Sequence, residues 1–525
     1  MTDPRHQGVR HQDVWLGVDL GTQSVRALAV TDDGRVLGRG SAPLTGHREG
    51  DRHEQLPADW WRAAGDAIRR TLSALSASAS ASTSTTPTPA RGRARVRGVA
   101  VCGTSGTVLL TDARGVPLTP ALMYDDGRAG AEARYAQETG AEVWDALGLR
   151  IQPSWALAKL LWLTGAGPGA RAGGGAKGSG DSGTLRGARV CHQPDFITAR
   201  LVGRPVATDS SHALKTGYDL HTRSWPTAVH DRLGLSGLDF PAVVAPGTQL
   251  GTVCAEAAAD TGLAEGTPVI AGMTDGCAAQ LGSGAWEVGR WNTVLGTTLV
   301  LKGVTATPLR DPAGVLYNHR SPDGHWLPGG ASSVGAGALT HAFPGADLAR
   351  LDRLAADREP ASVVAYPLVS RGERFPFLAA DAEAFTLGRP SDDADHYAAL
   401  LQGVALAERL CLAYVRFLGA PIDGPVTFTG GATRSGYWNQ LRADVLGRPA
   451  ALPEQADSAL GMAVLAAHAV TGDDAARRMV RIRTILEPRP EAGRRFDGPF
   501  VTLVDALEER GWLPPDAAAY AREHG

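Results

Sequence analysis

The chain has 525 residues, which is enough for two or more domains that each bury a core. Its 52 basic and 55 acidic residues leave a net charge near zero, which gives no general attraction for nucleic acid or an anionic membrane. Residues 1–13 lack the apolar stretch of a secretory signal, no apolar run approaches the roughly 20 residues that span a bilayer, and five scattered cysteines lack C-x-x-C spacing. We expect a cytoplasmic protein that binds neither nucleic acid nor membrane.

The first predicted elements are two apolar strands, 14–18 and 25–30, joined by the turn DLGTQS at 19–24. Gly21 permits the backbone of a short hairpin and leaves no Cβ to keep a phosphate away. Donors for phosphate oxygens come from Thr22, Gln23 and Ser24. Asp19 would repel a phosphate unless a Mg²⁺ ion lies between them. An ordinary Asp-Gly hairpin would show the same pattern, so both interpretations stay open.

A helix over 59–75 follows, and strands are predicted at 96–102, 108–110 and 118–124. Two low-complexity stretches interrupt this domain, one rich in Ala, Ser, Thr and Pro at about 77–97 and one rich in Gly at about 165–187. Neither can bury enough apolar surface to offset its chain entropy, so both are interpreted as surface insertions.

An apolar strand at 267–273 stops at Thr274-Asp275-Gly276, and a small-residue helix follows at 277–282. Asp275 can cap this helix. It would also lie at the carboxyl edge of a sheet, where ligands bind in open α/β folds, and there it could accept the proton of an attacking hydroxyl. The residues alone leave both roles open.

A second strand, Gly-Thr turn and strand comprises 291–295, then Gly296, Thr297 and Thr298, then 299–304. This copy of the opening hairpin suggests two domains of related architecture, with chance similarity as the alternative. If the two turns face each other across an interdomain cleft, they would supply donors to a phosphate from both sides.

The second half contains core helices at 396–418 and 458–469 and a terminal docking helix at 501–520. A strand at 426–429 ends at Gly430 and Gly431, before a helix at 436–445. A backbone without side chains could lie against adenine or ribose there, although a turn that merely requires glycine would look the same.

Two loops of the first domain combine hydroxyl donors, carboxylate acceptors and a guanidinium: Thr104-Ser105-Gly106-Thr107 and Asp125-Asp126-Gly127-Arg128. This mixture suits a polyhydroxylated substrate, although a solvated Asp-Gly turn explains the second loop equally well. The sequence shows no nucleophile elbow, no H-E-x-x-H and no P-loop lysine, which disfavours hydrolase, zinc-protease and P-loop functions.

Taken in order, the blocks WLGVDLGTQSVRALAV, VIAGMTDGCAAQLGSGA, VLGTTLVLKG and FTGGATRSGYWNQLRADVLGRP resemble the FGGY family of carbohydrate kinases. The blocks TSGTVLL, MYDDGRA, GGASSVGAG and YPLVSRGERFPF are most similar to its D-ribulokinase branch, also called xylulokinase-like. The resemblance implies an α/β fold of two actin/ribonuclease-H-like domains, with ATP and Mg²⁺ in an interdomain ATP/sugar cleft. It implies a sugar-binding domain at 13–287, an ATP-binding domain at 288–490 and a docking segment at 491–525.

The same resemblance implies roles for individual residues. Asp275 resembles the family's catalytic base and is also expected to contact the sugar. Asp19 resembles the carboxylate that lies near metal and sugar. The phosphate loops are Gly21, Thr22, Gln23 and Ser24 in the first half and Gly296, Thr297 and Thr298 in the second. The adenosine site comprises Gly430, Gly431 and Asn439. Sugar contacts are expected from Ser105 and, by weaker similarity, from Thr104, Asp126 and Arg128.

Thr-Ser-Gly replaces the Met-His-Gly block common in xylulokinases, and the Gln-Arg-Glu of glycerol kinases is absent, which weakens the D-xylulose and glycerol interpretations. Ala432 stands where many relatives have a third glycine. We therefore expect ATP-dependent phosphorylation of the primary hydroxyl of a ketopentose, D-ribulose first, with D-xylulose or another ketose or polyol as alternatives. Alternatives of a different class are a non-catalytic sugar or nucleotide sensor and an actin-like ATPase. A homodimer is compatible with each of these functions.

Overall fold

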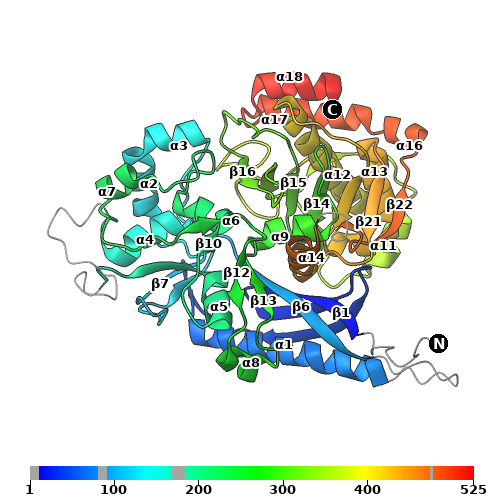
Figure 1. The fold of residues 1–525 in the computed structure, drawn as a ribbon. Coiled ribbons are helices and arrows are strands. Elements are labelled where there is room, and N and C mark those ends of the chain that lie inside the picture. Colours follow the sequence, from blue (N-terminus) through cyan, green and yellow to red (C-terminus); the bar gives the residue numbers. More distant parts are fainter. Residues whose placement is uncertain (1–10, 81–91, 168–184, 473–476) are drawn as a thin grey trace, which may run out of the picture. The chain divides into compact units, whose positions relative to one another are not determined.

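The computed structural model describes residues 11–80, 92–167, 185–472 and 477–525 (Figure 1). Most of the two predicted insertions, 77–97 and 165–187, lies outside these residues. By its internal contacts the chain divides into two compact units. Unit 1 takes its described residues from Met1–Gly282, His319–Pro322 and Asp457–Val480, and unit 2 from Ser283–Asn318, Asp323–Ala456 and Arg481–Gly525.

Unit 1 is built on a six-stranded sheet with the order β12-β13-β6-β1-β2-β3. Its strands are β1 (His11–Leu20), β2 (Ser24–Val30), β3 (Val36–Pro43), β6 (Gly92–Gly103), β12 (Gln249–Thr252) and β13 (Pro268–Ile270). Strands β1 to β3 form an antiparallel meander, whereas β1, β6 and β13 are parallel, and β12 pairs antiparallel with β13. The parallel strands therefore end at one edge of the sheet.

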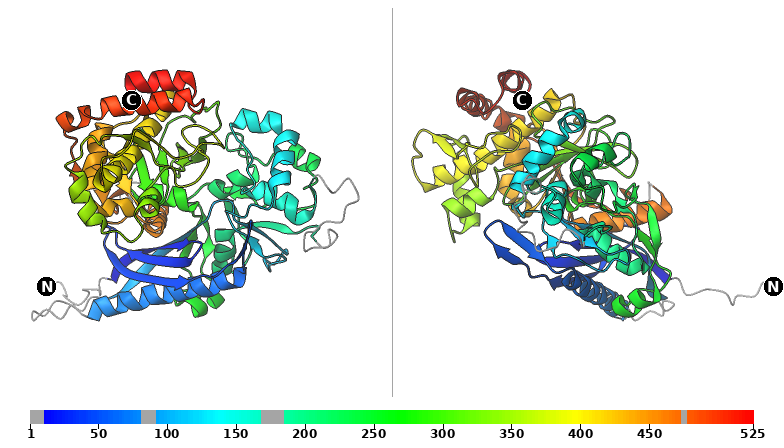
Figure 2. Two further views of the ribbon diagram at one scale, coloured as in Figure 1. Left: turned by 180° about the vertical axis from the view of Figure 1, so that it is seen from behind. Right: turned by 90° about the vertical axis from the view of Figure 1, so that its left-hand side faces the viewer.

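The alternation of side chains along β1 assigns its two faces to different helices. Leu16 and Val18 join the apolar core that includes Trp60 and Ile68 of helix α1 (Pro57–Ser80), which lies along the sheet (Figure 2). Gly17 points the other way, against helix α14 (Ser458–Thr471), and a Cβ on Gly17 would lie 1.8 Å from the Ala459 carbonyl oxygen. The sheet is thus covered by α1 on one face and α14 on the other.

Helix α14 belongs to unit 1, although its sequence lies within the range 288–490 expected for the second domain. It packs on β1 and β6 and beside α9 (Asp275–Gly282), as Figure 1 shows. The helices approach so closely that a Cβ on Gly461 would lie 1.8 Å from the Ala278 carbonyl oxygen. This contact brings the N-terminus of α14 next to the N-terminus of α9.

The rest of unit 1 is a smaller sheet with the order β4-β5-β8-β7-β9, a short parallel pair and several helices. The strands are β4 (His47–Glu49), β5 (Arg52–Gln55), β7 (Val108–Thr111), β8 (Ala121–Leu122), β9 (Arg189–His192), β10 (Thr208–Asp209) and β11 (Val243–Val244). The helices are α2 (Gly130–Thr139), α3 (Ala141–Leu147), α4 (Ala156–Thr164), α5 (Gln193–Val202), α6 (Ser210–Ala213), the 3₁₀ helix η2 (Leu214–Thr216), α7 (Thr227–Arg232) and α8 (Ala255–Thr261).

Unit 2 contains a seven-stranded sheet with the order β16-β17-β15-β14-β20-β21-β22. Its strands are β14 (Trp291–Leu295), β15 (Leu299–Gly303), β16 (Tyr317–Arg320), β17 (Trp326–Ser332), β20 (Val426–Thr429), β21 (Ala450–Pro453) and β22 (Ile482–Leu486). An antiparallel meander of β14, β15 and β17 is followed by parallel β20 and β21 and an antiparallel edge strand, β22. Apart from the additional strand β16, the unit 1 sheet has the same order and directions of strands, so the related architecture suggested by the two Gly-Thr hairpins is confirmed.

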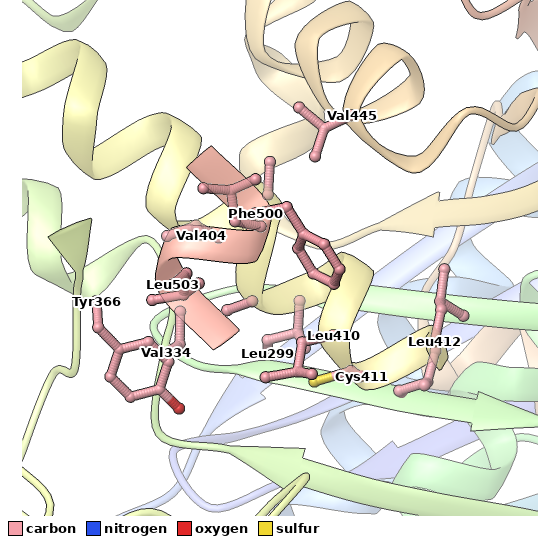
Figure 3. Close-up of a cluster of buried hydrophobic side chains, with 14 of the residues drawn as sticks. Leu299, Val334, Tyr366, Val404, Leu410, Cys411, Leu412, Val445, Phe500 and Leu503 are labelled. Carbon is pink, nitrogen blue, oxygen red and sulfur yellow. The ribbon is translucent and has the colours of Figure 1, made fainter. Parts of the chain in front are cut away.

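The core of unit 2 is centred on helix α12 (Asp393–Phe417), which fits the core helix predicted at 396–418. Figure 3 shows Val404, Leu410 and Cys411 of α12 packed with Phe500 and Leu503 of helix α17 (Asp497–Glu509). The helix is long and apolar enough to cross a membrane by length and composition, but 94% of that window is buried inside the protein. Its composition is therefore explained by the core.

Shorter elements complete unit 2. Strands β18 (Val364–Tyr366) and β19 (Phe385–Leu387) pair with each other. The remaining helices are α10 (Gly337–Ala342), α11 (Leu348–Ala355), the 3₁₀ helix η3 (Gly431–Arg434), α13 (Gly436–Leu446), α16 (Pro490–Arg494) and α18 (Pro515–His524). The segment predicted to dock, 491–525, forms helices whose buried residues join the core of unit 2.

Candidate functional site

The carboxyl edge of the unit 1 sheet gathers three of the predicted site segments. Asp19 pairs with Cys102 across the parallel strands β1 and β6, and a bridge joins Gly103 to Thr274 beyond the end of β13. Thr104 and Ser105 therefore follow one strand end, and Asp275 follows its neighbour. Because Asp19 has the parity of Gly17, its side chain lies on the face that α14 covers. The register of the sheet thus brings Asp19, Ser105 and Asp275 into one region.

Asp19 lies among like charges. Its pKa is raised from 3.8 to about 6, mainly by burial and then by the carboxylates of Asp275 and Asp457, against the opposing effects of Arg26 and Cys102. The Cys102 thiol lies 3.5 Å from the Asp19 carboxylate. Burial and the same acidic neighbours raise the pKa of that thiol well above its ordinary value. The edge therefore carries clustered negative charge that a bound cation would neutralise.

Asp275 is the first residue of α9, and its carboxylate accepts a hydrogen bond from the Gly276 N–H at 2.7 Å. Its own carbonyl oxygen accepts a hydrogen bond from the Ser458 hydroxyl at the start of α14, at 3.1 Å. The side chain is half-buried, so it is held in place and still reaches solvent. Such a carboxylate can accept a proton from a bound hydroxyl.

The first phosphate-loop candidate is a rigid hairpin turn. The Gly21 N–H donates to the Ser24 carbonyl oxygen at 3.2 Å, and the Gln55 side-chain amide donates to the Thr22 carbonyl oxygen at 2.7 Å. Gln55 is in turn held by the indole of Trp60. The Gln23 side chain is exposed. The turn is therefore anchored to α1 through Gln55 and Trp60, while the Gln23 side chain faces solvent.

The predicted sugar contacts differ in how much hydrogen-bonding capacity they retain. Thr104 is buried, and its N–H and hydroxyl both donate to the Gln193 side-chain oxygen, at 2.7 and 2.8 Å. The buried Ser105 hydroxyl has no hydrogen-bond partner among the described residues. Ser105 is therefore equipped to contact a ligand, whereas Thr104 is engaged within the protein.

Asp126 and Arg128 bond mainly to each other and to the neighbouring strand. The fully buried Asp126 accepts from the His53 N–H at 2.9 Å and from the Arg128 guanidinium at 2.7 Å. Arg128 also pairs with Glu54 at 2.6 Å, and its guanidinium lies 4.3 Å from the Trp162 ring centroid. Because a carboxylate accepts about four hydrogen bonds, Asp126 keeps little capacity for a sugar. The geometry favours a structural role for this pair.

Sequence reasoning missed two buried residues that hold the sugar loops. Lys159 is fully buried and donates to the carbonyl oxygens of Gly106 at 3.1 Å and Met123 at 2.5 Å, which joins the two loops. Burial lowers its pKa to about 7, against the attraction of Asp126. The signal was a lone charge in the apolar run ALAKLLWL at 156–163. The second missed residue, Gln193, had no comparable signal.

In unit 2 the second Gly-Thr turn is supported by the segment that leads into α10. The N–H groups of Ala336 and Gly337 donate to the carbonyl oxygens of Gly296 and Thr297, each at 3.0 Å. The side chain of Thr297 is exposed, and Thr298 is half-buried. Like the first turn, this one is held by hydrogen bonds to its carbonyl oxygens and has an exposed side chain at its tip.

The adenosine candidates lie at the end of β20. Gly430 has φ of 89°, and a Cβ there would lie 2.5 Å from the Leu295 carbonyl oxygen, so the position requires glycine. A cavity of about 400 Å³ lies beside this turn, within unit 2. It is lined by Thr433, Arg434, Gly436, Asn439, Leu452, Arg483, Thr484 and Leu486. Gly430 and Gly431 are thus adjacent to the cavity rather than part of its lining.

Asn439 is the buried polar side chain of this cavity. Its amide nitrogen donates to the Thr433 carbonyl oxygen at 2.9 Å, and its side-chain oxygen has no hydrogen-bond partner among the described residues. The two arginines of the lining come from different elements, and sequence reasoning missed both, since solvated surface arginines look the same in the sequence.

Comparison with known proteins covers both units. Residues 14–282 match the FGGY family of carbohydrate kinases, N-terminal domain, and residues 291–470 match the C-terminal domain of the same family. The chain belongs to this family. As an FGGY carbohydrate kinase it is an ATP-dependent sugar kinase, and the predicted family, enzyme class and two-domain fold are confirmed.

Several relatives of this FGGY kinase are named xylulose kinases. It is 30% identical to the xylulose kinase of Streptomyces coelicolor over 513 residues, which cover 96% of this chain and 98% of the relative. The crystal structure of xylulose kinase from Rhodospirillum rubrum superposes with a TM-score of 0.79 at 28% identity, covering 95% of this chain and 99% of that one. A gluconokinase of Bacillus subtilis is 25% identical over 86% of this chain and 87% of the relative. The D-ribulokinase branch remains a prediction.

Proposed function

We propose that this FGGY kinase transfers the γ-phosphoryl group of ATP to the primary hydroxyl of a pentulose. D-Xylulose is the leading substrate, because relatives that match nearly the whole chain are xylulose kinases. The observation that carries the proposal is the carboxyl edge of the unit 1 sheet, which brings the acidic pair Asp19 and Asp275 into the same region as the unpartnered Ser105 hydroxyl. A polyol needs both acceptors and donors of this kind.

D-Ribulose is the second candidate. The Thr104-Ser105-Gly106 segment stands where common xylulokinases carry Met-His-Gly, and its serine is the member with an unused hydroxyl. The two pentuloses differ in the orientation of one hydroxyl, which a single hydrogen-bonding side chain can discriminate. A change at this segment therefore bears directly on sugar choice.

In the proposed reaction Asp275 accepts the proton of the attacking hydroxyl, and Ser105 orients the sugar. The two Gly-Thr turns donate hydrogen bonds to phosphate oxygens, and such hydrogen bonds stabilise the charge that develops during phosphoryl transfer. Since phosphoryl transfer has a loose transition state, a carboxylate of ordinary strength suffices as the base. The remaining site residues keep the roles that the family resemblance implies, except that Thr104, Asp126 and Arg128 support the sugar loops from inside the protein.

The carboxylates present fit a magnesium ion. Asp19 is half-buried near the like charges of Asp275 and Asp457, and Mg²⁺ is commonly held by one or two carboxylates together with phosphate oxygens. The described residues form no cluster of three or more His, Cys, Asp or Glu side chains that could hold a metal by themselves. We therefore propose Asp19 as the protein ligand, with nucleotide oxygens completing the coordination. When bound, the ion would supply charge neutralisation to the phosphates.

The cavity of unit 2 is proposed to take the adenosine of ATP. The unpartnered oxygen of Asn439 can accept a hydrogen bond from the exocyclic amine of adenine. Guanine presents a carbonyl oxygen at the corresponding position, which Asn439 would repel. We therefore propose that this residue favours ATP over GTP.

Turnover with a panel of ketoses tests the proposal. Purified protein with Mg-ATP is assayed with D-xylulose, D-ribulose, L-ribulose, D-fructose and glycerol, and the phosphosugar is identified by mass spectrometry and NMR. The highest kcat/KM is expected with D-xylulose. A higher value with D-ribulose would select the second candidate. Sugar-independent ATP hydrolysis without a phosphosugar would contradict the kinase proposal and favour an ATPase, and binding without turnover would favour a sensor.

Gln193→Glu is expected to raise the KM for sugar about 10- to 100-fold while the KM for ATP stays unchanged. The Thr104 N–H fixes the orientation of the buried Gln193 amide, because only the side-chain oxygen can accept it. The amide nitrogen then keeps donors without a partner among the described residues, and we propose that it contacts the sugar. Glutamate retains the acceptor and removes the donors. Steady-state kinetics with the exposed Gln152→Glu as control check this, and an unchanged sugar KM would remove the proposed contact.

A further inference from the structure

The loops that carry Ser105 and Asp275 begin at neighbouring strand ends. The bridge between Gly103 and Thr274 is the last ladder contact before the chain leaves the sheet on both sides. Beyond that bridge, the distance between sugar loop and base depends on contacts from outside the sheet. Helix α6 supplies such contacts.

The centre of these contacts is the buried carboxylate of Asp209, the residue before α6. One of its oxygens accepts from the Ser211 N–H at 2.8 Å, the Ser211 hydroxyl at 2.6 Å and the His212 N–H at 3.1 Å. The other lies 2.6 Å from Nδ1 of His212. Both His212 and Ser211 are fully buried. The carboxylate therefore fixes the orientation of both side chains.

The two side chains reach the two strand ends. Nε2 of His212 lies 3.3 Å from the carbonyl oxygen of Gly103, directly before the sugar loop. The hydroxyl of Ser211 accepts a hydrogen bond at 2.8 Å from the N–H of Thr274, directly before Asp275. The Asp209 carboxylate is thus linked through His212 to Gly103 and through Ser211 to Thr274.

Both ring nitrogens of His212 face groups that only accept hydrogen bonds, a carboxylate and a backbone carbonyl. A neutral imidazole has one N–H and would leave one of these contacts as a repulsion between lone pairs. Burial opposes the charged form, but Asp209, followed by Asp195 of α5 and Asp275 of α9, raises the pKa of His212 above its ordinary value. A further titratable neighbour is His192 of β9, whose ring centroid lies 6.0 Å from that of His212. The 2.6 Å contact with the Asp209 carboxylate and the carbonyl at the other nitrogen therefore favour an imidazolium.

We propose that Asp209, Ser211 and protonated His212 are positioning residues that hold the sugar loop and the catalytic base at a fixed separation, and that loss of the His212 proton sets an alkaline limit on activity. The proposal rests on the proposed role of Asp275. Below its raised pKa, His212 donates to Gly103 and the ion pair with Asp209 stabilises the fold. As pH rises through that pKa, both the donation and the stabilisation are lost.

The pH dependence of kcat is the first test. Wild-type kcat should fall at alkaline pH, and His212→Gln should lower kcat about 10- to 100-fold at neutral pH and remove that alkaline decline, because a glutamine amide does not titrate. The control is His230→Gln, at a buried histidine of α7 that stacks on the Phe240 ring and whose pKa is lowered to about 4. It should retain the wild-type profile. An unchanged alkaline decline in His212→Gln would overturn the proposal.

Ser211→Ala tests the second connection without touching a charge. It leaves the Thr274 N–H without its acceptor, so kcat is expected to fall about 10-fold with little change in the KM for ATP, and Ser211→Thr should restore most of it. Equal activity of Ser211→Ala and wild type would contradict the positioning role.

A measurement on the wild-type chain separates this proposal from the proposed function. In protein labelled with ¹⁵N-histidine, at least one side chain should keep imidazolium shifts at a pH above the ordinary histidine pKa. If none does, the proposal fails whatever the variants show. If Asp275→Asn instead kept full activity, the proposed base would fail while the state of His212 would stand on its own result.

Discussion

Asp275→Asn is expected to lower kcat about 10²- to 10⁴-fold, the usual contribution of a general base. Asparagine has nearly the same shape, and its side-chain oxygen can still accept the Gly276 N–H that Asp275 accepts at 2.7 Å. The bond from Ser458 to the backbone oxygen of residue 275 is also unaffected. The fold and the position of α9 should therefore persist. Only the ability to accept a proton is removed.

Single-turnover kinetics with the preferred pentulose check this prediction, because they report the chemical step rather than product release. The KM for ATP and the melting temperature should stay close to wild type. A matched control is Asp497→Asn, since Asp497 is likewise the first residue of a helix, α17, but is exposed in unit 2. If Asp275→Asn kept more than about a tenth of wild-type kcat, Asp275 would not be the base.

Asp19→Asn is expected to abolish most activity, by about 10²-fold or more, and at the same time to leave the protein as stable as wild type or more stable. Burial and the carboxylates of Asp275 and Asp457 disfavour the ionised form of Asp19. A neutral amide removes this repulsion. It also removes the charge proposed to hold Mg²⁺, so activity should require a much higher Mg²⁺ concentration.

The raised pKa of Asp19 gives this prediction a sign with pH. The folded chain holds the proton up to about 6, whereas the ordinary value is 3.8, so wild-type stability falls as pH rises between these values. The melting temperature of Asp19→Asn should therefore exceed that of wild type by the largest amount above pH 6. This difference should become smaller as the pH is lowered toward 5. Wild-type kcat/KM should fall as pH drops through about 6, because the carboxylate becomes protonated. A variant that melts well below wild type at pH 7.5 would contradict the account.

Local patterns in the sequence were sufficient for much of this picture. The alternating strands, the two Gly-Thr turns and the strand-to-helix position of Asp275 each depend on residues within a few positions of one another. Glycine at 430 is required by a positive φ, which a strand followed by Gly-Gly already suggests. These features belong to turn chemistry and side-chain period, which a sequence displays directly.

The partners of buried polar groups could not be predicted in the same way. Asp126 and Arg128 resembled sugar ligands, yet the structure engages them with each other and with Glu54 on β5, more than 70 positions earlier in the chain. Lys159 and Gln193 gained their positions from loops that lie 36 to 89 positions away. Such pairs depend on which strands and helices meet, and no local pattern encodes that.

The sequence by itself determined the family, the chemistry of ATP-dependent sugar phosphorylation and the carboxylate Asp275 at a strand end. Only the tertiary structure decided that α14 covers the face of β1 from which Asp19 projects, although about 440 positions of the chain separate the helix from Asp19. Such a contact is feasible because the entropic cost of closing a loop grows only slowly with its length. It also decided that Asp209, Ser211 and His212 reach the ends of β6 and β13. The physical reason is that strand register and helix packing create these neighbours, and both are properties of the whole folded unit.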